Sequence, residues 1–212
     1  MRTPFSTEIK MKRLFGMFAA VSLLLAVAGC SSAYNLAQKL LGAWSSVPER
    51  LIDTDASSAT IIETYAFSPL DSVKNGGLIQ LTSLISVTGA VQGTPGISTP
   101  VSLTASGYAT VSGKWTATSS EAVEITLDMS TLVVNVDPEA VLISTNISDD
   151  VDNAVTEQLR PQFAKSVRNQ LLKAATERYS GVMKLNDVRI IDDTTLKFKL
   201  NKNPYTLTRQ PE

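Results

Sequence analysis

Residues 77–87 read GLIQLTSLISV, and every second side chain from Ile79 onward is apolar except Ser83. Successive side chains of a β-strand point to opposite faces, so this period of two predicts a strand with one buried face. Residues 101–105, VSLTA, repeat the pattern after a Gly- and Pro-containing turn. The inward positions are Ile79, Leu81, Ile85 and Val87 in the first strand and Val101, Leu103 and Ala105 in the second.

The whole stretch 75–113 has no charged side chain and is rich in Ser, Thr and Gly. Such a composition also suits a flexible linker, but the alternation favours strands. The same alternation extends outward in both directions, from about residue 43 to residue 147 and again after residue 187. The clearest further strands are 123–128, 132–136, 196–200 (with Lys197 and Lys199 on the polar side) and 205–209.

Between these two β-rich parts the apolar period changes from two to four. Val155, Leu159, Phe163 and Val167 belong to a stripe that predicts an amphipathic helix over about 149–180. Pro161 interrupts the pattern and predicts a kink, or a second helix that begins there. The sequence therefore predicts a mainly β, antiparallel protein of about 8–10 strands with one long helix packed on it.

The first 30 residues have the organisation of a secretory signal. Residues 14–28 form an uncharged, apolar run that follows Lys12 and Arg13 and leads to Cys30, the only cysteine. The run is shorter than the roughly 20 residues that a membrane-spanning helix needs. We expect a cleaved signal peptide over 1–29, a tether with a short lead-in helix over 30–42, and one domain over 43–209 that contains the helical insertion.

The segment Leu25-Ala26-Val27-Ala28-Gly29-Cys30 resembles the lipobox of bacterial lipoproteins. That resemblance implies cleavage before Cys30 and attachment of acyl chains to its thiol, since several chains are needed for firm anchoring. It also implies a protein of the bacterial cell envelope. The residue after the cysteine is Ser31, and in this the sequence resembles lipoproteins of the outer membrane that face the periplasm. The lipid on Cys30 would then be the contact with the membrane.

Composition argues against most catalytic chemistry. The 212 residues carry a formal charge of −1, no histidine and one cysteine. Removal of the leader's four basic residues and one acidic residue leaves 15 basic and 19 acidic side chains. Ser-His-Asp and Cys-His catalysis, imidazole zinc sites and an internal disulfide are excluded, and no basic surface for nucleic acid is indicated. We expect that the protein is not an enzyme and that it binds neither a cofactor nor a metal ion.

Two groups of acidic residues bear on this expectation. Asp149, Asp150, Asp152 and Asn153 offer oxygen ligands of the kind that calcium prefers, but acidic residues at a helix start are explained by the helix dipole. Glu63, Glu121 and Glu124 could supply a pair of carboxylates for hydrolysis. Nothing in the sequence fixes a distance between any two of these, so they are interpreted as solvated side chains.

Gly42-Ala43-Trp44 follows the lead-in helix and opens the first strand. It resembles the Gly-x-Trp signature of lipocalins, although Gly113-Lys114-Trp115 repeats the pattern. In that family the tryptophan closes one end of an up-and-down barrel and an arginine from a late strand packs across it, a role that falls here to Arg209. The resemblance implies a lipocalin-like barrel or half-barrel. A β-sandwich with a packed helix is the alternative.

The combined hypothesis is a monomeric, lipid-anchored envelope protein that binds a small apolar or amphipathic ligand without catalysis. Ser83, Ala105 and Gly107 interrupt the apolar face with small side chains, which would leave room for a ligand. The alternative is an envelope scaffold or protein-interaction module with a solid core. The candidate ligand-lining residues are Tyr65, Phe67, Ile79, Leu81, Ile85, Val101 and Leu103.

Overall fold

The computed structural model describes residues 32–54, 57–91, 101–144 and 149–211, apart from the side chains of residues 52, 91, 149–155 and 158. Within these residues it contains a short helix over 32–40, a long helix and ten strands. The elements are β1 (Gly42–Ser46), β2 (Glu49–Asp53), β3 (Ser57–Leu70), β4 (Val73–Val91), β5 (Val101–Ala117), β6 (Val123–Val136), η1 (Pro138–Ala140), β7 (Leu142–Ser144), α2 (Asp149–Tyr179), β8 (Val182–Ile191), β9 (Thr195–Leu200) and β10 (Asn203–Arg209).

The strands form one antiparallel sheet whose pairing returns to its starting point. The order is β1-β10-β9-β8-β6-β5-β4-β3, and β1 pairs with both β10 and β3. We call this closed set of strands the ring. β2 continues the pairing along β3, and β7 pairs with β5. The predicted mainly β, antiparallel architecture with a long helix is confirmed, and three strands follow the helix as the sequence indicates.

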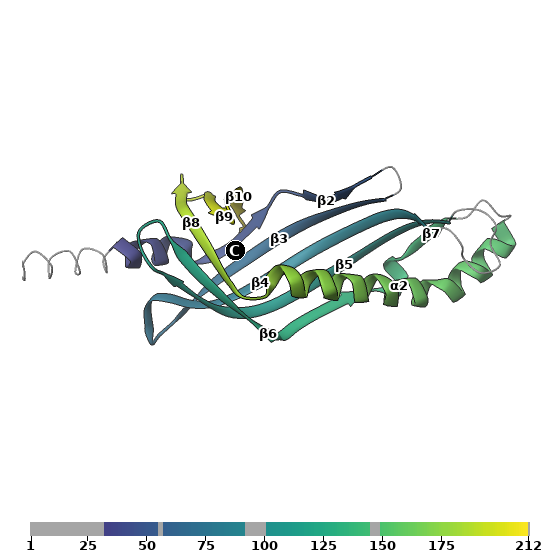
Figure 1. Ribbon diagram of the computed structural model, residues 1–212, viewed down its shortest axis with the longest axis horizontal. Coiled ribbons are helices and arrows are strands. Elements are labelled where there is room, and N and C mark those ends of the chain that lie inside the picture. The colour runs from purple at the N-terminus through teal and green to yellow at the C-terminus, as the bar shows by residue number, and fades with distance from the viewer. Residues whose placement is uncertain (1–31, 55–56, 92–100, 145–148, 212) are drawn as a thin grey trace, which may run out of the picture.

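The ring is not a regular barrel, because its central strands are much longer than the others. β4 has 19 residues and β5 has 17, whereas β1 has five and β9 has six. At about 3.4 Å per residue, β4 is roughly 60 Å long. The long strands continue past the ring as an open, curved sheet, and α2 lies along this part (Figure 1). We call it the helix-covered end.

The helix α2 is continuous from Asp149 to Tyr179, with Pro161 inside it. A second helix beginning at Pro161 is therefore wrong, and Figure 1 shows one bent helix instead. A proline removes one backbone donor and crowds the preceding turn, which bends a helix without necessarily ending it. The side chains of Asp149, Asp150, Asp152 and Asn153 lie outside the described residues, so the choice between helix cap and calcium stays a prediction.

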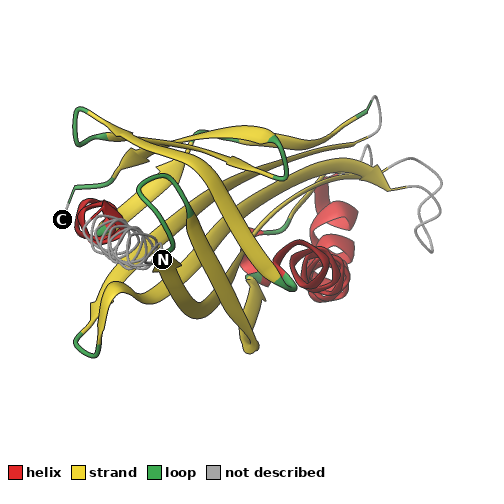
Figure 2. Ribbon diagram, turned by 60° about the vertical axis from the view of Figure 1, so that its left-hand side comes forward, coloured by secondary structure: helices red, strands yellow, loops and turns green. Residues whose placement is uncertain are grey.

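One hydrophobic core runs through both parts of the molecule. The buried side chains of the strands alternate with more accessible ones as the period of two predicts, most regularly in β5 and β3. The α2 side chains Ala164, Val167, Leu171 and Ala175 join the same core. Figure 2 shows the two helices on opposite sides of the strongly curved sheet, so the short helix marks one end of the molecule and α2 covers the other.

Candidate functional site

Trp44 and Arg209 are brought together where the first and last strands pair. Trp44 is opposite Arg209 in the β1–β10 register and opposite Tyr65 in the β1–β3 register. The Arg209 guanidinium carbon lies 4.1 Å from the centre of the Trp44 ring, which is 0 % exposed. The contact expected from the Gly-x-Trp resemblance is therefore present. A cation above an indole contributes about 0.5–2 kcal/mol, more when it is desolvated.

The polar atoms of this pair bind the short helix. Arg209 donates from Nη1 to the Leu41 carbonyl at 2.6 Å, from Nη2 to the Lys39 carbonyl at 2.8 Å and from Nε to the Asp193 carbonyl at 2.7 Å. Trp44 Nε1 donates to the Leu40 carbonyl at 2.7 Å. The last carbonyls of a helix lack partners within it, and a cation there is also attracted by the negative end of the helix dipole. These bonds fix the helix of residues 32–40 to the ring.

Gly42 is needed at this junction for two reasons. Its φ of +105° is a conformation that L side chains rarely adopt, and it ends the short helix in the way that a glycine does. A Cβ at this position would also lie only 2.9 Å from Arg209 Nη1. The glycine therefore allows both the turn into β1 and the approach of the guanidinium.

The candidate ligand-lining residues all point inward, but they are packed rather than accessible. Each is at most 7 % exposed, and all except Val101 belong to the same contiguous core cluster. Aromatic side chains fill the inside of the ring of strands. The centre of the Phe67 side chain lies 5.3 Å from that of Trp115, edge to face, and the centre of Tyr65 lies 6.2 Å from that of Phe198. No described surface hollow is lined by any of these seven candidates.

The small residues on the inner face do not leave the space that the sequence suggests. A Cβ on Gly107 would lie 2.9 Å from Leu171 of α2 and 2.8 Å from Val136. Ala105 is 0 % exposed. The Ser83 hydroxyl is hydrogen-bonded to the Tyr179 hydroxyl. Ser83 and Gly107 therefore allow α2 to approach the sheet closely, and the interpretation that they open a cavity is wrong for these two positions.

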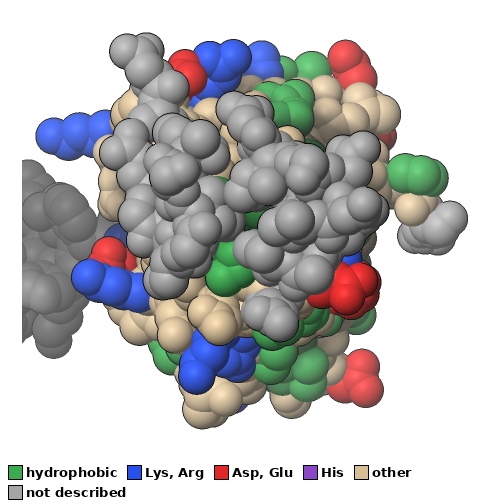
Figure 3. Space-filling view, turned by 90° about the vertical axis from the view of Figure 1, so that its right-hand side faces the viewer, with side chains coloured by type: hydrophobic (Ala, Val, Ile, Leu, Met, Phe, Trp, Pro, Cys, Tyr) green, Lys and Arg blue, Asp and Glu red, His purple; other side chains and the backbone are tan. Residues whose placement is uncertain are grey.

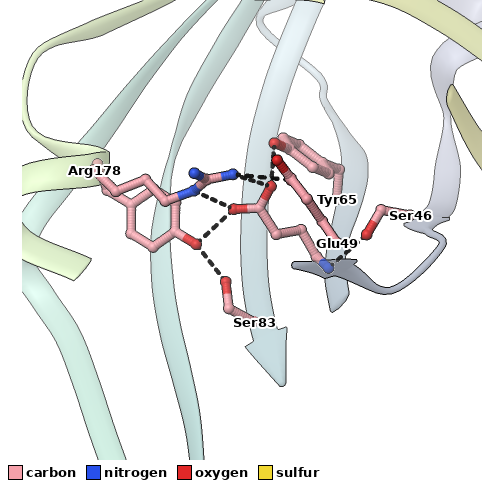
Figure 4. A network of polar contacts seen from close by, with 7 residues as sticks. Ser46, Glu49, Tyr65, Ser83 and Arg178 are labelled. Carbon is pink, nitrogen blue, oxygen red and sulfur yellow. Dashed lines mark hydrogen bonds and ion pairs between the residues drawn. The ribbon is translucent and has the colours of Figure 1, made fainter. Parts of the chain in front are cut away.

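A buried carboxylate, Glu63 on β3, forms the most densely bonded polar site among the described residues. Arg178 at the end of α2 donates two parallel hydrogen bonds to it, Nε to Oε1 at 2.9 Å and Nη2 to Oε2 at 3.0 Å. Tyr179 donates to Oε1 at 2.7 Å and Tyr65 to Oε2 at 3.3 Å. We call Glu63, Tyr65, Ser83, Arg178 and Tyr179 the Glu63 cluster (Figure 4).

The members of this cluster differ in how far they are exposed to solvent. Glu63 is 2 % exposed, whereas the Arg178 side chain is 31 % exposed and also lies 3.7 Å from Glu49. Burial, followed by the negative charge of Glu63, raises the pKa of both Tyr65 and Tyr179. The hydrogen bonds to Glu63 raise the pKa of Arg178. The arginine therefore stays charged and both phenols stay protonated as donors over the ordinary pH range.

Chemically, the Glu63 cluster is a clamp between α2 and β3. Both carboxylate oxygens are occupied by donors, and none of the five residues lines a described hollow. A general acid or base needs a proton that substrate can reach. The described contacts instead hold the last turn of the helix on the sheet through paired, charge-assisted bonds.

The interpretation of Glu63 as a solvated residue is wrong. A signal was present, because Glu63 shares the inward parity of Tyr65 and Phe67 on an otherwise apolar strand face. A charge at such a position requires a partner. What the sequence could not supply was the partner, since Arg178 lies 115 positions later. Glu121 and Glu124, by contrast, lie outside the core, in agreement with their interpretation as solvated side chains.

The described residues hold neither a metal-binding cluster nor a membrane-spanning helix. No group of three or more acidic or cysteine side chains is arranged to hold a metal ion in the part of the chain that the structure describes. No helix within 32–54, 57–91, 101–144 or 149–211 combines the length and apolarity needed to cross a membrane. Cys30 lies outside the described residues.

Comparison with family models, with curated proteins and with solved structures found no match for this chain.

Proposed function

We propose that this protein is a lipid-anchored protein of the bacterial cell envelope, without enzymatic activity, that acts as an interaction module with a filled core. The proposal of an interaction module rests on the observation that the inner face of the sheet is filled. Aromatic side chains fill the inside of the ring, and at the helix-covered end Leu171 of α2 lies against Gly107. A ligand pocket for a small molecule usually encloses about 300–1,000 Å³ of concave, largely apolar space. The candidate lining side chains border no such described space.

The anchor proposal rests on the lipobox-like segment and is supported by the position of the short helix. Cys30 lies two positions before the described helix of residues 32–40. Arg209 and Trp44 bind the last carbonyls of that helix, so it is fixed to the ring. A lipid on Cys30 would therefore hold the short-helix side of the molecule near the membrane. The membrane we propose is the outer membrane, with the protein facing the periplasm.

The opposite end would then project away from the membrane. It is formed by the start of α2 and the far ends of the long strands (Figure 1). Around the residues drawn in grey on this face, the described basic, acidic and apolar side chains are interspersed (Figure 3). A mixed surface of this kind suits a protein partner better than a highly charged polymer.

The lipocalin-like interpretation of the ring belongs to the same proposal. Gly42, Trp44 and Arg209 support it, since they close β1 against β10 as the family signature implies. It keeps a second function in view, the binding of a small apolar ligand. That function would require space between α2 and the apolar inner faces of β5 and β6, which this single helix covers.

The anchor is tested on Cys30. We expect the protein isolated from cells that were fed an alkyne fatty acid to carry the label and to begin at Cys30. Cys30→Ala should carry no label. A label that persists in the alanine variant, or a mature terminus elsewhere in the chain, would show that the lipoprotein assignment is wrong.

The core is tested on the same material by native mass spectrometry. We expect the mass of the mature chain plus its acyl groups and nothing further. A bound apolar molecule that survives gentle ionisation and is lost on unfolding would favour the ligand-binding function over the filled-core module. Protein that has been unfolded and refolded without lipid serves as the control.

A further inference from the structure

A hollow of about 400 Å³ lies beside the short helix, on the side of the molecule where the anchor would be. The helix contributes one face, with Ser32, Asn35, Leu36 and Lys39 at helical spacing. The other walls are the β5–β6 turn, with Ser120 and Glu121, and the edge of β8, with Val188, Arg189 and Ile190. Figures 1 and 2 show the short helix beside that turn.

The walls of this hollow are held in place independently of any ligand. Arg209 and Trp44 fix the helix through its last carbonyls. In the β5–β6 turn, the Thr118 amide donates to the Ala122 carbonyl at 2.9 Å. In β8 the register shifts between Asn186 and Arg189, and the Val188 amide leaves the ladder to donate to the Glu121 carbonyl at 2.9 Å. The irregularity in β8 therefore bonds this strand to the turn and helps to form the hollow.

Two of the lining side chains are cations outside the ion pairs of the described residues. Neither Lys39 nor Arg189 lies within ion-pair distance of a described carboxylate. Asp187, two positions before Arg189, is paired with Lys199 at 2.8 Å, and Lys199 first and the charge of Arg189 after it lower the pKa of Asp187. Glu121 is the only carboxylate among the lining residues, so the hollow has a net positive charge.

We propose that this hollow binds the phosphate-bearing headgroup of an anionic phospholipid of the membrane in which the protein is anchored. The inference rests on the proposed anchor, because a lipid on Cys30 is what brings the hollow to the bilayer surface. Lys39 and Arg189 would face the phosphate, with the neutral side chains of Asn35 and Ser120 on either side. Headgroup binding would fix the orientation of the whole molecule on the membrane, which an acyl tether alone does not do.

The experiment uses the mature, lipidated protein in a neutral detergent and compares three probes. These are short-chain phosphatidylglycerol, short-chain phosphatidylcholine and inorganic phosphate, with binding measured by isothermal titration. We expect phosphatidylglycerol to bind more tightly than either of the others. Equal binding of inorganic phosphate would reassign the hollow to a free anion and overturn the lipid proposal. Failure to distinguish the two lipids would overturn it as well.

Variants locate the binding in the hollow. Each basic residue near an anionic lipid contributes about five-fold to binding, so Lys39→Gln with Arg189→Gln should weaken phosphatidylglycerol binding about 25-fold. Glu121→Gln should strengthen it. The matched control is Lys165→Gln with Lys173→Gln, which makes the same change of charge on exposed positions of α2. If the control pair weakens binding as much as the hollow pair, the effect is one of net charge and the site is wrong.

The outcomes separate this proposal from the anchor. Intact mass shows whether Cys30 is acylated, and the titration shows whether the hollow selects an anionic headgroup. A chain that lacks acyl groups but selects phosphatidylglycerol would contradict only the anchor. An acylated chain without headgroup selectivity would contradict only the hollow. Circular dichroism of the variants checks that each one is folded.

Discussion

The ring and the helix-covered end bury their apolar faces by different means. In the ring, the sheet closes on itself through backbone pairs on both sides of β1, and aromatic side chains fill the inside. At the helix-covered end the sheet stays open, and one helix supplies the missing layer. That helix packs its apolar face on the sheet, and its last turn is bonded to β3 by Arg178 and Tyr179 on Glu63.

The difference shows what each kind of closure requires of the sequence. Backbone pairing needs only strands of compatible register, whereas a side-chain clamp needs particular residues at two distant positions. Burying a carboxylate costs several kcal/mol unless its partners are well placed. The clamp is therefore expected to be more sensitive to single substitutions of polar residues, and the ring to the loss of large apolar ones.

The largest effect is expected from loss of the closing aromatic in the ring. Trp44→Ala removes a fully buried indole and should lower the free energy of unfolding by about 3–5 kcal/mol. Arg209→Ala removes the stacked guanidinium and three hydrogen bonds to carbonyls, and should cost about 2–4 kcal/mol. Chemical denaturation measures both.

The double variant tests whether the two residues act as one contact. Each single variant loses the same stacking interaction, so the two costs should sum to clearly more than the cost of the pair. Arg50→Ala is the matched control, since its ion pair with Asp53 is exposed and should contribute at most about 1 kcal/mol. Additive costs for Trp44 and Arg209 would show that their proximity does not close the ring.

A smaller effect is expected at the clamp. Glu63→Gln keeps the shape of the side chain but removes the charge that Arg178 and two phenols bind. Breaking one partner of a buried pair costs about 3–5 kcal/mol. Because Arg178 is partly exposed and can regain water, we expect about 2–3 kcal/mol.

The same substitution at an exposed ion pair is the control. Glu124 lies 3.2 Å from Lys184 on the protein surface, and Glu124→Gln should change stability by less than about 1 kcal/mol. Hydrogen exchange should show the last turns of α2 opening more readily in Glu63→Gln than in Glu124→Gln. Equal protection of α2 in both variants would show that the helix does not depend on the clamp.

The two regions also differ in how far the sequence predicts them. Period-two alternation placed the strands and their buried sides, since inward and outward residues of a half-buried strand differ in polarity at every step. The Gly42-Ala43-Trp44 segment and the parity of Arg209 pointed to the contact between chain ends. Both signals are local, and the second was given its meaning by a family resemblance.

The helix-covered end was predicted less well, because its closure depends on pairs that are far apart along the chain. The stripe of α2 predicted that it would pack on the sheet, but not where. Ser83 and Gly107 suggested open space, whereas one binds Tyr179 and the other makes room for Leu171. Glu63 was on the correct parity, but nothing near it in the sequence identified Arg178.

Alkaline pH tests the stability that the clamp contributes without any substitution. Burial and the charge of Glu63 raise the pKa of Tyr65 and of Tyr179, so the folded protein keeps both phenols protonated above about pH 10, where unfolded tyrosines ionise. The stability that these phenols contribute is fully present below about pH 10. It should decrease above that value by about 1.4 kcal/mol per pH unit for each of them.

Denaturation at a series of pH values from about 9 to about 12, with phenolate absorbance followed in parallel, measures this slope. Tyr179→Phe should roughly halve it, because one of the two buried phenols no longer ionises on unfolding. Tyr34→Phe is the matched control, since it makes the same substitution at an exposed position outside the clamp. If the buried phenols ionise near pH 10 while the protein is still folded, the clamp does not hold its donors in place, and the contrast with the ring loses its electrostatic basis.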